Sequence, residues 1–256
     1  MKLHGKTALV TGASRGIGRA ISLELAKSGL KSLIIVARTQ EDLDALAREI
    51  NQRNADISVV VLPLDLTDPV AVNTAIAKTW RDYGAIHLLV NCAGVAYQTP
   101  FLKARLPDVY QEISLNLIGL YSMTRCMARR MVSQGEGTIV NVSSLMGKVA
   151  APSMSTYSAT KFAILGFSQA LRCELAPRNV KVVTLLPTLT DTDMIRNFQR
   201  FRGVKAMTPQ RVAQSLMQGL EHNSSEILVG WQSHLAVWCQ RFAPWLLDRI
   251  LQWSMP

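Results

Sequence analysis

A glycine-rich turn close to the N-terminus restricts the fold of this chain more than any other feature. The turn reads Thr11-Gly-Ala-Ser-Arg-Gly-Ile-Gly18 and lies between the apolar run Thr7–Thr11 and the segment Ile17–Lys27, whose apolar residues recur with helical spacing. A strand, a glycine-rich turn and a helix in this order present backbone N–H groups and the positive end of a helix dipole to a phosphate. The glycine spacing is G-x-x-x-G-x-G rather than the commoner G-x-G-x-x-G of dinucleotide sites. We expect the turn to bind a pyrophosphate through Gly12, Ser14, Arg15, Gly16, Ile17 and Gly18.

The rest of the chain alternates between apolar runs and segments of helical periodicity. The runs are apolar on both faces, which is typical of strands in a parallel sheet covered by helices on both sides. Right-handed crossovers then predict an α/β fold, a Rossmann-type doubly wound parallel sheet. Since no repeat or linker divides the chain, we expect a single domain over residues 1–256, with a core at about 4–230 and a tail at about 231–256. The expected strands are Thr7–Thr11, Leu33–Ala37, Val59–Leu64, His87–Val90, Thr138–Val142, Val180–Leu186 and Ile227–Val229.

Charge and cysteine usage limit the classes of function. The chain has 28 Lys and Arg against 18 Asp and Glu, a formal net charge of +10, which attracts phosphates, acidic carrier proteins, nucleic acids and anionic lipids alike. No nucleic-acid-recognition motif accompanies the charge, so we expect no nucleic-acid partner. The four cysteines are scattered and form no CxxC pair, which predicts neither a metal site nor a disulfide framework. With no secretory-signal pattern and no apolar run long enough to span a bilayer, the chain is expected in the cytoplasm.

The end of the second expected strand indicates which dinucleotide binds. It reads Val36-Ala37-Arg38-Thr39, with an arginine and no carboxylate. A carboxylate there would bind the ribose hydroxyls of NAD, whereas an arginine would bind the 2′-phosphate of NADP. We therefore expect NADP(H), with Arg38 at the 2′-phosphate and Arg15 as a second contact. For each arginine, a solvated surface charge is the alternative.

A tyrosine and a lysine stand four residues apart in a segment of helical periodicity, so that Tyr157 and Lys161 project from one helix face. A phenol with a pKa near ~10 is a poor base at neutral pH, and a neighbouring ammonium would lower that pKa. Ser144 follows the end of the expected strand Thr138–Val142, where its hydroxyl can hydrogen-bond a substrate oxygen as charge develops. Behind a nucleotide-binding turn, this set predicts carbonyl–alcohol chemistry.

These motifs, in this order, resemble those of the short-chain dehydrogenase/reductase family over roughly residues 4–230. The turn at 11–18 is similar to the family's cofactor loop, Asp65-Leu66-Thr67 resembles the segment that contacts adenine, and Asn91-Cys92-Ala93-Gly94 resembles the Asn-Asn-Ala-Gly motif. Asn116 matches the asparagine that anchors a water-mediated proton relay. The resemblance implies a catalytic set of Asn116, Ser144, Tyr157 and Lys161. It implies further cofactor contacts by Asp65, Leu66, Asn91, Ala93, Gly94, Tyr157, Lys161, Pro187, Thr190 and Thr192.

The resemblance also implies the roles of the catalytic residues. Tyr157 would protonate the carbonyl oxygen during reduction, and Ser144 would orient the substrate. Lys161 would hold the nicotinamide ribose and lower the pKa of Tyr157. Family members are expected to form a homodimer or a homotetramer.

One segment departs from the family pattern. After the sixth strand the family has Pro-Gly-x-Val/Ile-x-Thr, where this chain has Pro187 to Thr192 with Thr188 in place of glycine and Thr190 in place of the aliphatic residue. The side chain of Thr188 is expected to crowd the nicotinamide or the substrate, or to hydrogen-bond one of them. Cys92, which replaces the second asparagine of its motif, is expected to fill space beside the cofactor rather than act as a reactive thiol.

The segment Asp191–Met207 lies where this family places its substrate lid, and we expect a helical lid there. Its apolar residues suit a hydrophobic ligand, and its basic residues suit a carboxylate, a phosphate or an acidic carrier. A solvated basic helix face is the alternative. The apolar residues are Met194, Ile195, Phe198 and Phe201, and the basic ones are Arg196, Arg200, Arg202 and Lys205.

The tail is rich in tryptophan, with four of the five tryptophans of the chain. Pro244 is expected to divide it into two short helices. Three uses stay open: packing against the body or a sister subunit, a lid over an apolar substrate, and an in-plane membrane anchor with tryptophans at the headgroup level. The tail tryptophans are Trp231, Trp238, Trp245 and Trp253.

The expected function is hydride transfer between NADP(H) and a carbonyl/alcohol pair, in the direction of reduction of a hydrophobic ketone or a 3-oxoacyl-type substrate. One alternative is a 3-oxoacyl carrier-protein reductase of fatty-acid synthesis, which the basic surface suits. Another is a catalytically silent NADP(H)-binding protein, against which the intact Asn116, Ser144, Tyr157 and Lys161 argue. The substrate itself does not follow from the sequence, because the lid and the tail lie outside the family's shared motifs.

Overall fold

The computed structural model describes residues 2–199 and 205–254, and within them seven strands form one parallel sheet. The strand order is β3-β2-β1-β4-β5-β6-β7, and every neighbouring pair is parallel. The order reverses between β1 and β4, so this single-domain fold is the doubly wound Rossmann type that the sequence predicts. The strands are β1 Thr7–Thr11, β2 Ser32–Ala37, β3 Ser58–Pro63, β4 Leu88–Asn91, β5 Gly137–Val142, β6 Val180–Leu186 and β7 Glu226–Leu228. Each begins and ends within one residue of its expected position.

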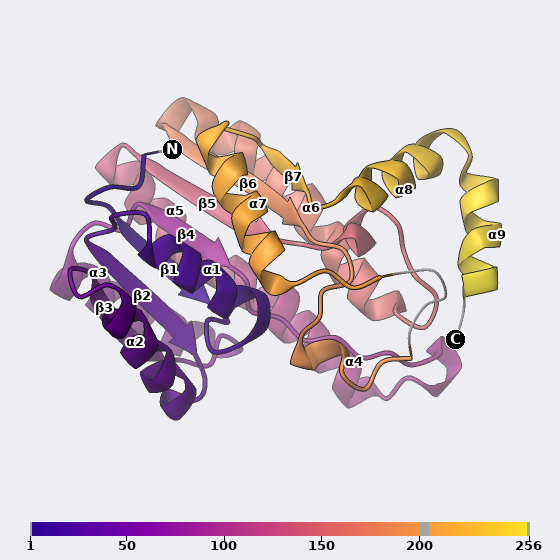
Figure 1. Ribbon diagram of the computed structural model, residues 1–256, viewed down its shortest axis with the longest axis horizontal. Coiled ribbons are helices and arrows are strands. Elements are labelled where there is room, and N and C mark those ends of the chain that lie inside the picture. Colours follow the sequence, from indigo (N-terminus) through magenta and orange to yellow (C-terminus); the bar gives the residue numbers. More distant parts are fainter. Residues whose placement is uncertain (1, 200–204, 255–256) are drawn as a thin grey trace.

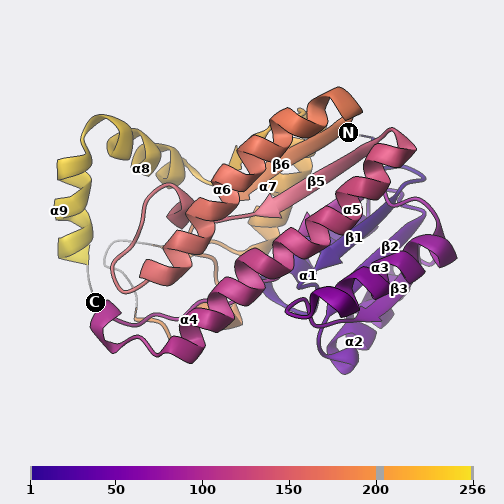
Figure 2. The same ribbon diagram turned by 180° about the vertical axis from the view of Figure 1, so that it is seen from behind.

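Helices connect the strands and cover both faces of the sheet. Figure 1 shows α1, α2 and α7 over one face, and Figure 2 shows α3, α5 and α6 over the other. The α-helices of the body are α1 Gly16–Ala26, α2 Gln40–Arg53, α3 Pro69–Tyr83, α4 Leu106–Ile113, α5 Leu120–Gln134, α6 Ser155–Leu175 and α7 Pro209–Glu221. Shorter turns of helix are η1 Phe101–Lys103, η2 Ser114–Gly119, η3 Leu145–Gly147, η4 Ala176–Arg178 and η5 Asp193–Ile195. Of these, η2 is a π-helix that joins α4 to α5.

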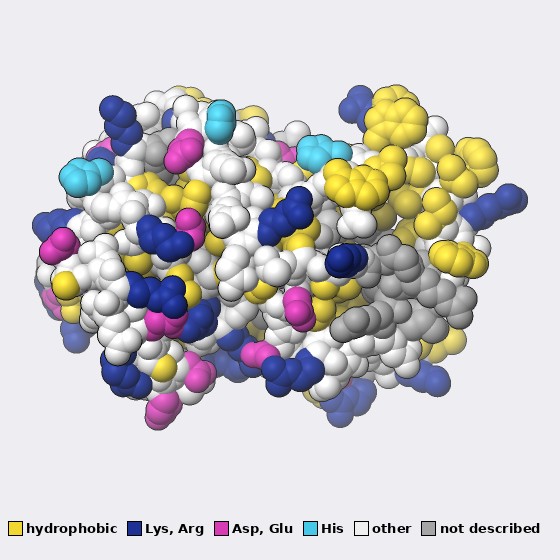
Figure 3. All heavy atoms as spheres, viewed as in Figure 1, with side chains coloured by type: hydrophobic (Ala, Val, Ile, Leu, Met, Phe, Trp, Pro, Cys, Tyr) yellow, Lys and Arg dark blue, Asp and Glu magenta, His cyan; other side chains and the backbone are white. Residues whose placement is uncertain are grey.

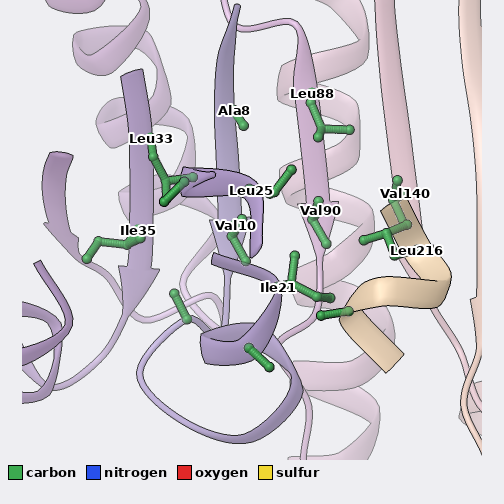
Figure 4. Packing of buried hydrophobic residues seen from close by; sticks show 14 of the residues in the cluster. Ala8, Val10, Ile21, Leu25, Leu33, Ile35, Leu88, Val90, Val140 and Leu216 are labelled. Atoms are coloured by element: carbon green, nitrogen blue, oxygen red, sulfur yellow. The ribbon is translucent and has the colours of Figure 1, made fainter. Parts of the chain in front are cut away.

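Two apolar layers, one on each side of the sheet, hold the helices in place. Along β1, Ala8 and Val10 face the layer under α1, α2 and α7, while Leu9 faces the layer under α3 and α5. Figure 4 shows Ile21 and Leu25 of α1 among the strand residues of the first layer. Because the middle residues of β1, β2, β4, β5 and β6 are apolar and buried, the sheet packs between two layers of helices that position its carboxyl edge.

The tail forms two helices, α8 Trp231–Phe242 and α9 Pro244–Ser254, and the break at Pro244 is confirmed. They extend from one end of the molecule (Figure 1). None of the helices in the described part of the chain has the length and apolar character that crossing a bilayer requires. The expected lid contains, in its described part, the 3₁₀ turn η5 and a bridge between Thr190 and Met207. Phe201, Arg200 and Arg202 of that expectation lie outside the described residues.

Candidate active site

A cleft of about 440 Å³ opens at the carboxyl ends of β1 and β4, where the strand order reverses. Ligands of doubly wound sheets bind at this switch point, because the loops from the two halves diverge there. One end of the cleft is formed by the glycine-rich turn and the end of β2, and the other by residues of α6 and of the loop after β4. The predicted site residues among its lining are Gly12, Ser14, Arg15, Gly16, Ile17, Gly18, Arg38, Leu66, Ala93, Gly94, Tyr157, Lys161 and Thr192.

The glycines of the turn between β1 and α1 let its backbone border the cleft directly. Gly12 and Gly16 have φ values of 65° and 56°, in the region that favours glycine. A Cβ on Gly12 would lie 2.8 Å from the Cα of Ala93, and one on Gly18 would lie 2.1 Å from the carbonyl oxygen of Gly12. Arg15, the N-cap of α1, makes no side-chain capping bond, so the first N–H groups of the helix remain available to a ligand. This cradle fits a diphosphate.

Thr11 joins the two halves of the sheet directly beneath the cleft. Its hydroxyl accepts hydrogen bonds from the N–H groups of Cys92 (3.0 Å) and Ala93 (3.2 Å). Asn91, which the resemblance places at the cofactor, points into the interior instead, where its amide donates to Thr124 (2.8 Å) and to Asn141 (2.9 Å). Asn91 is therefore a structural link between β4, β5 and α5, and Thr11 is a positioning residue that sequence reasoning did not single out.

Arg38 lies exposed at the wall of the cleft, at the end of β2. Asp65 lies close enough for Arg38 to lower the pKa of its carboxyl, although the larger cause is the backbone N–H of Thr67, which donates to the carboxylate at 2.9 Å. The side chain of Asp65 thus closes its own turn and does not line the cleft; Leu66, the next residue, does. An exposed guanidinium at this wall suits a phosphate on the ribose.

Tyr157 and Lys161 line the other end of the cleft, and Ser144, which does not line it, lies beside the tyrosine side chain. Tyr157 and Lys161 project from the first turns of α6, with the lysine Nζ 5.4 Å from the centre of the tyrosine ring. The Nζ of Lys161 donates to the carbonyl oxygen of Val142 at 3.1 Å, which holds the ammonium at the end of β5. Ser144 hydrogen-bonds the tyrosine side chain and caps η3, accepting from the N–H of Met146 at 3.1 Å. The three predicted residues therefore form one cluster.

The protonation of this cluster differs from the expectation that Lys161 makes Tyr157 more acidic. Burial raises the pKa of Tyr157 to about 12, although the hydrogen bond with Ser144 acts in the opposite direction. The same burial lowers the pKa of Lys161 to about 8. The physical reason is that desolvation penalises the phenolate and the ammonium alike and is the largest cause at each group. Tyr157 is thus a protonated phenol at neutral pH, suited to donate a proton.

Asn116 lies in the π-helix η2 and is fully buried. Its side-chain amide pairs with the backbone of Val95, accepting from the N–H at 2.8 Å and donating to the carbonyl at 2.9 Å, and it also donates to Thr160 of α6 at 3.3 Å. The side chain therefore holds the loop after β4 against α6. Asn116 does not line the cleft itself, so its place in the site is behind the wall that Val95 forms.

Glu112 supports the same wall, and sequence reasoning missed it. It is 2% exposed, and it accepts a hydrogen bond of 2.7 Å from the N–H of Tyr97, a residue that lines the cleft. Burial raises the pKa of this carboxyl, while the N–H of Tyr97 lowers it. A signal existed: Glu112 precedes Asn116 by four residues in a helical segment, so the two share a face.

The segment after β6 brings Thr188 into the interior. Its hydroxyl is buried and has no hydrogen-bond partner among the described residues, while its carbonyl accepts from the hydroxyl of Thr190 at 2.9 Å. The carbonyl of Pro187 accepts from the N–H of Leu145 at 2.8 Å and so ties this segment to the turn that carries Ser144. Pro187 and Thr190 do not line the cleft, whereas Thr192 does and lies against Gly16.

Cys92 borders the cleft and is half-buried. Burial raises its pKa to about 12, against the weaker opposing effect of Lys161. A thiol with so high a pKa is protonated and unreactive at neutral pH. No group of three or more potential metal ligands occurs in the described part of the chain.

The protein combines a doubly wound sheet with a backbone cradle for a diphosphate and a serine–tyrosine–lysine cluster at the far end of the cleft. This combination defines a nucleotide-dependent oxidoreductase. A family model described as short chain dehydrogenase matches residues 6–203. The chain belongs to this family, as its motifs indicate.

Relatives and solved structures agree with that assignment. The chain is 37% identical over 194 residues to the 3-oxoacyl-[acyl-carrier-protein] reductase of Aquifex aeolicus, covering 76% of this chain and 77% of that protein. It is similar to a short chain dehydrogenase from Burkholderia cenocepacia in complex with NADP, with a TM-score of 0.85, 29% identity and complete coverage (100%) of both chains. It is also similar to the 3-ketoacyl-(acyl-carrier-protein) reductase of Brucella melitensis complexed with NADH, with a TM-score of 0.81, 26% identity, and 90% and 99% coverage. These likenesses support a nicotinamide cofactor in either form.

Proposed function

We propose that this protein is an NADP(H)-dependent reductase of a hydrophobic ketone or 3-oxoacyl-type substrate. The observation that carries the proposal is the pair Tyr157 and Lys161 at the opposite end of the cleft from the diphosphate cradle, with Ser144 beside the tyrosine. That separation allows a dinucleotide to bind at the turn while its reactive end lies beside the tyrosine. The cofactor supplies the hydride, and the chain supplies the proton and the orientation.

The chain's own residues account for the proton step. Tyr157, held protonated by burial, donates its proton to the carbonyl oxygen as negative charge develops there. Ser144 orients the same oxygen with its hydroxyl. Lys161, fixed by the carbonyl of Val142, places a positive charge next to the tyrosine that must give up its proton. With a pKa of about 12 the phenol is protonated at neutral pH, which is the form that reduction requires.

Preference for NADP(H) over NAD(H) belongs to the proposal. Arg38 at the end of β2 supports it, with Arg15 at the N-terminus of α1 as a second cation on the same cleft. Asp42 of α2 also lines this end, so the phosphate site is not purely basic. A lower Michaelis constant for NADPH than for NADH is the expected result with purified protein, and the reverse order contradicts this part of the proposal.

The substrate end of the cleft is apolar, which supports a hydrophobic carbonyl. Val95, Leu115 and Met194 line it together with Tyr157. A second candidate is a 3-oxoacyl carrier-protein reductase, favoured by the Aquifex aeolicus relative and by the net charge of +10, which would attract an acidic carrier. Oxidation of NADPH in the presence of ketones, free 3-oxoacyl thioesters and carrier-bound thioesters separates the two.

Residence in the cytoplasm stays part of the proposal and rests on the pattern of the cysteines.

The decisive experiment replaces the proton donor. Tyr157→Phe removes the hydroxyl and leaves the ring, so we expect turnover to fall by about a thousandfold or more while NADPH binding, followed by fluorescence, changes little. The matched control is Tyr83→Phe, an exposed tyrosine at the end of α3, which is expected to leave turnover unchanged. A Tyr157→Phe protein with near-normal turnover would remove the proposed mechanism.

A further inference from the structure

Helix α8 presents its apolar side to the outside. Trp231, Leu235, Trp238 and Phe242 are 69%, 56%, 61% and 62% exposed, and their spacing of three and four residues aligns them in one stripe. Its buried residue is a polar one, Ser233, whose hydroxyl donates to the carbonyl of Val229 at 2.7 Å. The half-buried residues of α8 are Gln232, Ala236, Val237 and Cys239, so the helix contacts the body through its smaller side chains while its large apolar ones face outward.

Helix α9 also exposes most of its large apolar side chains. Trp245, Leu246, Ile250 and Trp253 are exposed, and Leu247 is the buried apolar residue that anchors the helix. Figure 3 shows hydrophobic side chains gathered at the end of the molecule that carries these two helices. None of the described residues that line the cleft comes from α8 or α9, so use as a lid is not what these contacts support.

The segment η1–α4 lies toward the same end of the molecule as α9 (Figures 1 and 2). It exposes large apolar side chains as well, with Leu102 94% exposed. Many large apolar side chains exposed at one end of a molecule are unusual on a soluble monomer and mark a contact with a partner. We call the exposed set the apolar rim: Phe101, Leu102, Leu106, Tyr110, Trp231, Leu235, Trp238, Phe242, Trp245, Leu246, Ile250 and Trp253.

The charges around the apolar rim select its partner. Arg241 and Arg249 accompany it on α8 and α9, and Lys103 lies within η1. Asp248 is the sole acid in the sequence from 231 to 256, and the whole chain carries +10. A second copy of the chain would bring like charges together, whereas a bilayer with anionic headgroups attracts them. Tryptophan suits that boundary too, because its indole has an apolar body and one N–H for the headgroup layer.

We propose that the apolar rim docks into the headgroup region of an anionic phospholipid bilayer. The helices would lie in the plane of the membrane, with the tryptophans at headgroup level and the arginines on the phosphates. Binding of this kind is reversible and grows with buried apolar area and with the anionic lipid fraction. It goes beyond the proposed function and does not depend on it.

Vesicle flotation of the full-length protein tests the apolar contribution. The vesicles contain phosphatidylcholine alone, or phosphatidylcholine with about a third phosphatidylserine. We expect binding to the anionic vesicles and a fall of about tenfold or more in partitioning for Trp231→Ser/Trp238→Ser. The control, Val70→Ser/Tyr83→Ser, removes exposed apolar side chains from α3 at the opposite end of the molecule and is expected to bind as wild type does.

The electrostatic contribution has its own pair of variants, which preserve every apolar side chain. We expect Arg241→Gln/Arg249→Gln to lower partitioning by about tenfold, whereas Lys78→Gln/Arg81→Gln on α3, with the same loss of charge, changes it little. Raised salt is expected to weaken wild-type binding for the same reason. Equal losses in the two charge variants would indicate a general effect of net charge and would overturn docking through this surface.

Two further outcomes overturn the proposal. One is a wild-type protein that stays with the soluble fraction on anionic vesicles. The other is a tryptophan variant whose mass by light scattering falls relative to wild type, which would assign α8 to a contact between copies. Flotation is done without cofactor or carbonyl, and NADPH oxidation is measured separately on the same proteins. Failure of membrane docking is thereby distinguished from failure of the proposed enzyme activity.

Discussion

Tyr157 and Lys161 are neighbours in the active site, but their pKa values differ widely, and this difference determines how activity depends on pH. Burial raises the pKa of Tyr157 to about 12 and lowers that of Lys161 to about 8. Below pH 8 the site therefore holds a neutral phenol and an ammonium. Above pH 8 the phenol keeps its proton, but the lysine loses its charge.

The first pH prediction follows from that order. The value of kcat/KM for reduction is expected to be level below about pH 8 and to fall above it, because the neutral lysine no longer favours departure of the tyrosine proton. A profile of kcat/KM against pH measures this fall, and unfolding experiments at each pH establish the range in which the protein stays folded. Lys161→Arg, whose charge persists, is expected to remove the fall in whatever activity it retains. A wild-type profile that stays level to about pH 10 would show that the charge of Lys161 is not required.

Thr188 gives a second prediction at the residue scale. Its buried hydroxyl lacks a partner in the described residues, and an unsatisfied buried hydroxyl costs about 1–3 kcal/mol. Thr188→Val keeps the shape and removes the hydroxyl, so the free energy of unfolding without cofactor is expected to rise by about 1 kcal/mol in urea denaturation. The matched variant Thr190→Val removes a hydroxyl that donates to the carbonyl of Thr188, and is expected to lower it. A destabilised Thr188→Val protein would mean that this hydroxyl is bonded.

At the scale of elements, the sequence predicts most of what positions the cleft. Mostly apolar runs bounded by helical periodicity predict all seven strands to within one residue, because the middle of each inner strand is buried on both faces. The turn between β1 and α1 is equally predictable, since only glycine fits the close contact between Gly18 and Gly12. Pro244 likewise predicts the break between α8 and α9.

The connection from α4 to α5 could not be predicted in the same way. Its π-helix, η2, differs from an α-helix in the spacing of its backbone hydrogen bonds, and the pattern of apolar residues does not reveal that spacing. The inward rotation of Asn91 and the burial of Glu112 depend on partners far along the chain, Asn141 and the N–H of Tyr97. The raised pKa of Tyr157 has the same origin, because desolvation depends on the whole surrounding packing and not on the spacing of Tyr157 and Lys161.

Glu112 provides the prediction for this connection. Its pKa is raised above 4.5, so between pH 4.5 and the raised value the folded form holds more protons than the unfolded form, and stability falls as pH rises through that window. Glu112→Gln keeps an acceptor for the N–H of Tyr97 without the charge. We expect this variant to be more stable than wild type by about 1 kcal/mol at neutral pH, and the gap to close below about pH 4.

Glu112→Ala is the matched control. It leaves the N–H of Tyr97 without its acceptor, so we expect lower stability at both pH values and a raised KM for the carbonyl substrate, since Tyr97 lines the cleft. Urea denaturation of the three proteins measures the stabilities. If Glu112→Gln were as destabilised as Glu112→Ala, the carboxylate charge itself would be holding the loop.

At the scale of the whole molecule, α5, α6 and the connection before α5 carry a second set of exposed apolar side chains. Tyr121 of α5 and Phe162 of α6 are 49% and 44% exposed. Ile118 of η2, three residues before Tyr121, is 46% exposed. Tyr121 also contacts Phe167 of α6, with 5.5 Å between ring centres, so the two helices share one outer face. Figure 2 shows α5 and α6 running alongside each other on that side of the sheet.

This face is where we expect copies of the chain to associate, since paired helices with an exposed aromatic row can pack against the same row in a two-fold partner. Tyr121→Glu/Phe162→Glu would place four carboxylates across such a contact, and light scattering is expected to give the mass of a monomer where wild type gives a dimer or tetramer. The control is Trp231→Ser/Trp238→Ser, which is expected to keep the wild-type mass because α8 faces a bilayer and not a second copy. A monomeric wild type, or an oligomer that survives the two glutamates, would contradict the assignment. If α5 and α6 contact a second copy and α8 contacts lipid, the glutamate variant becomes a monomer and the serine variant keeps the wild-type mass.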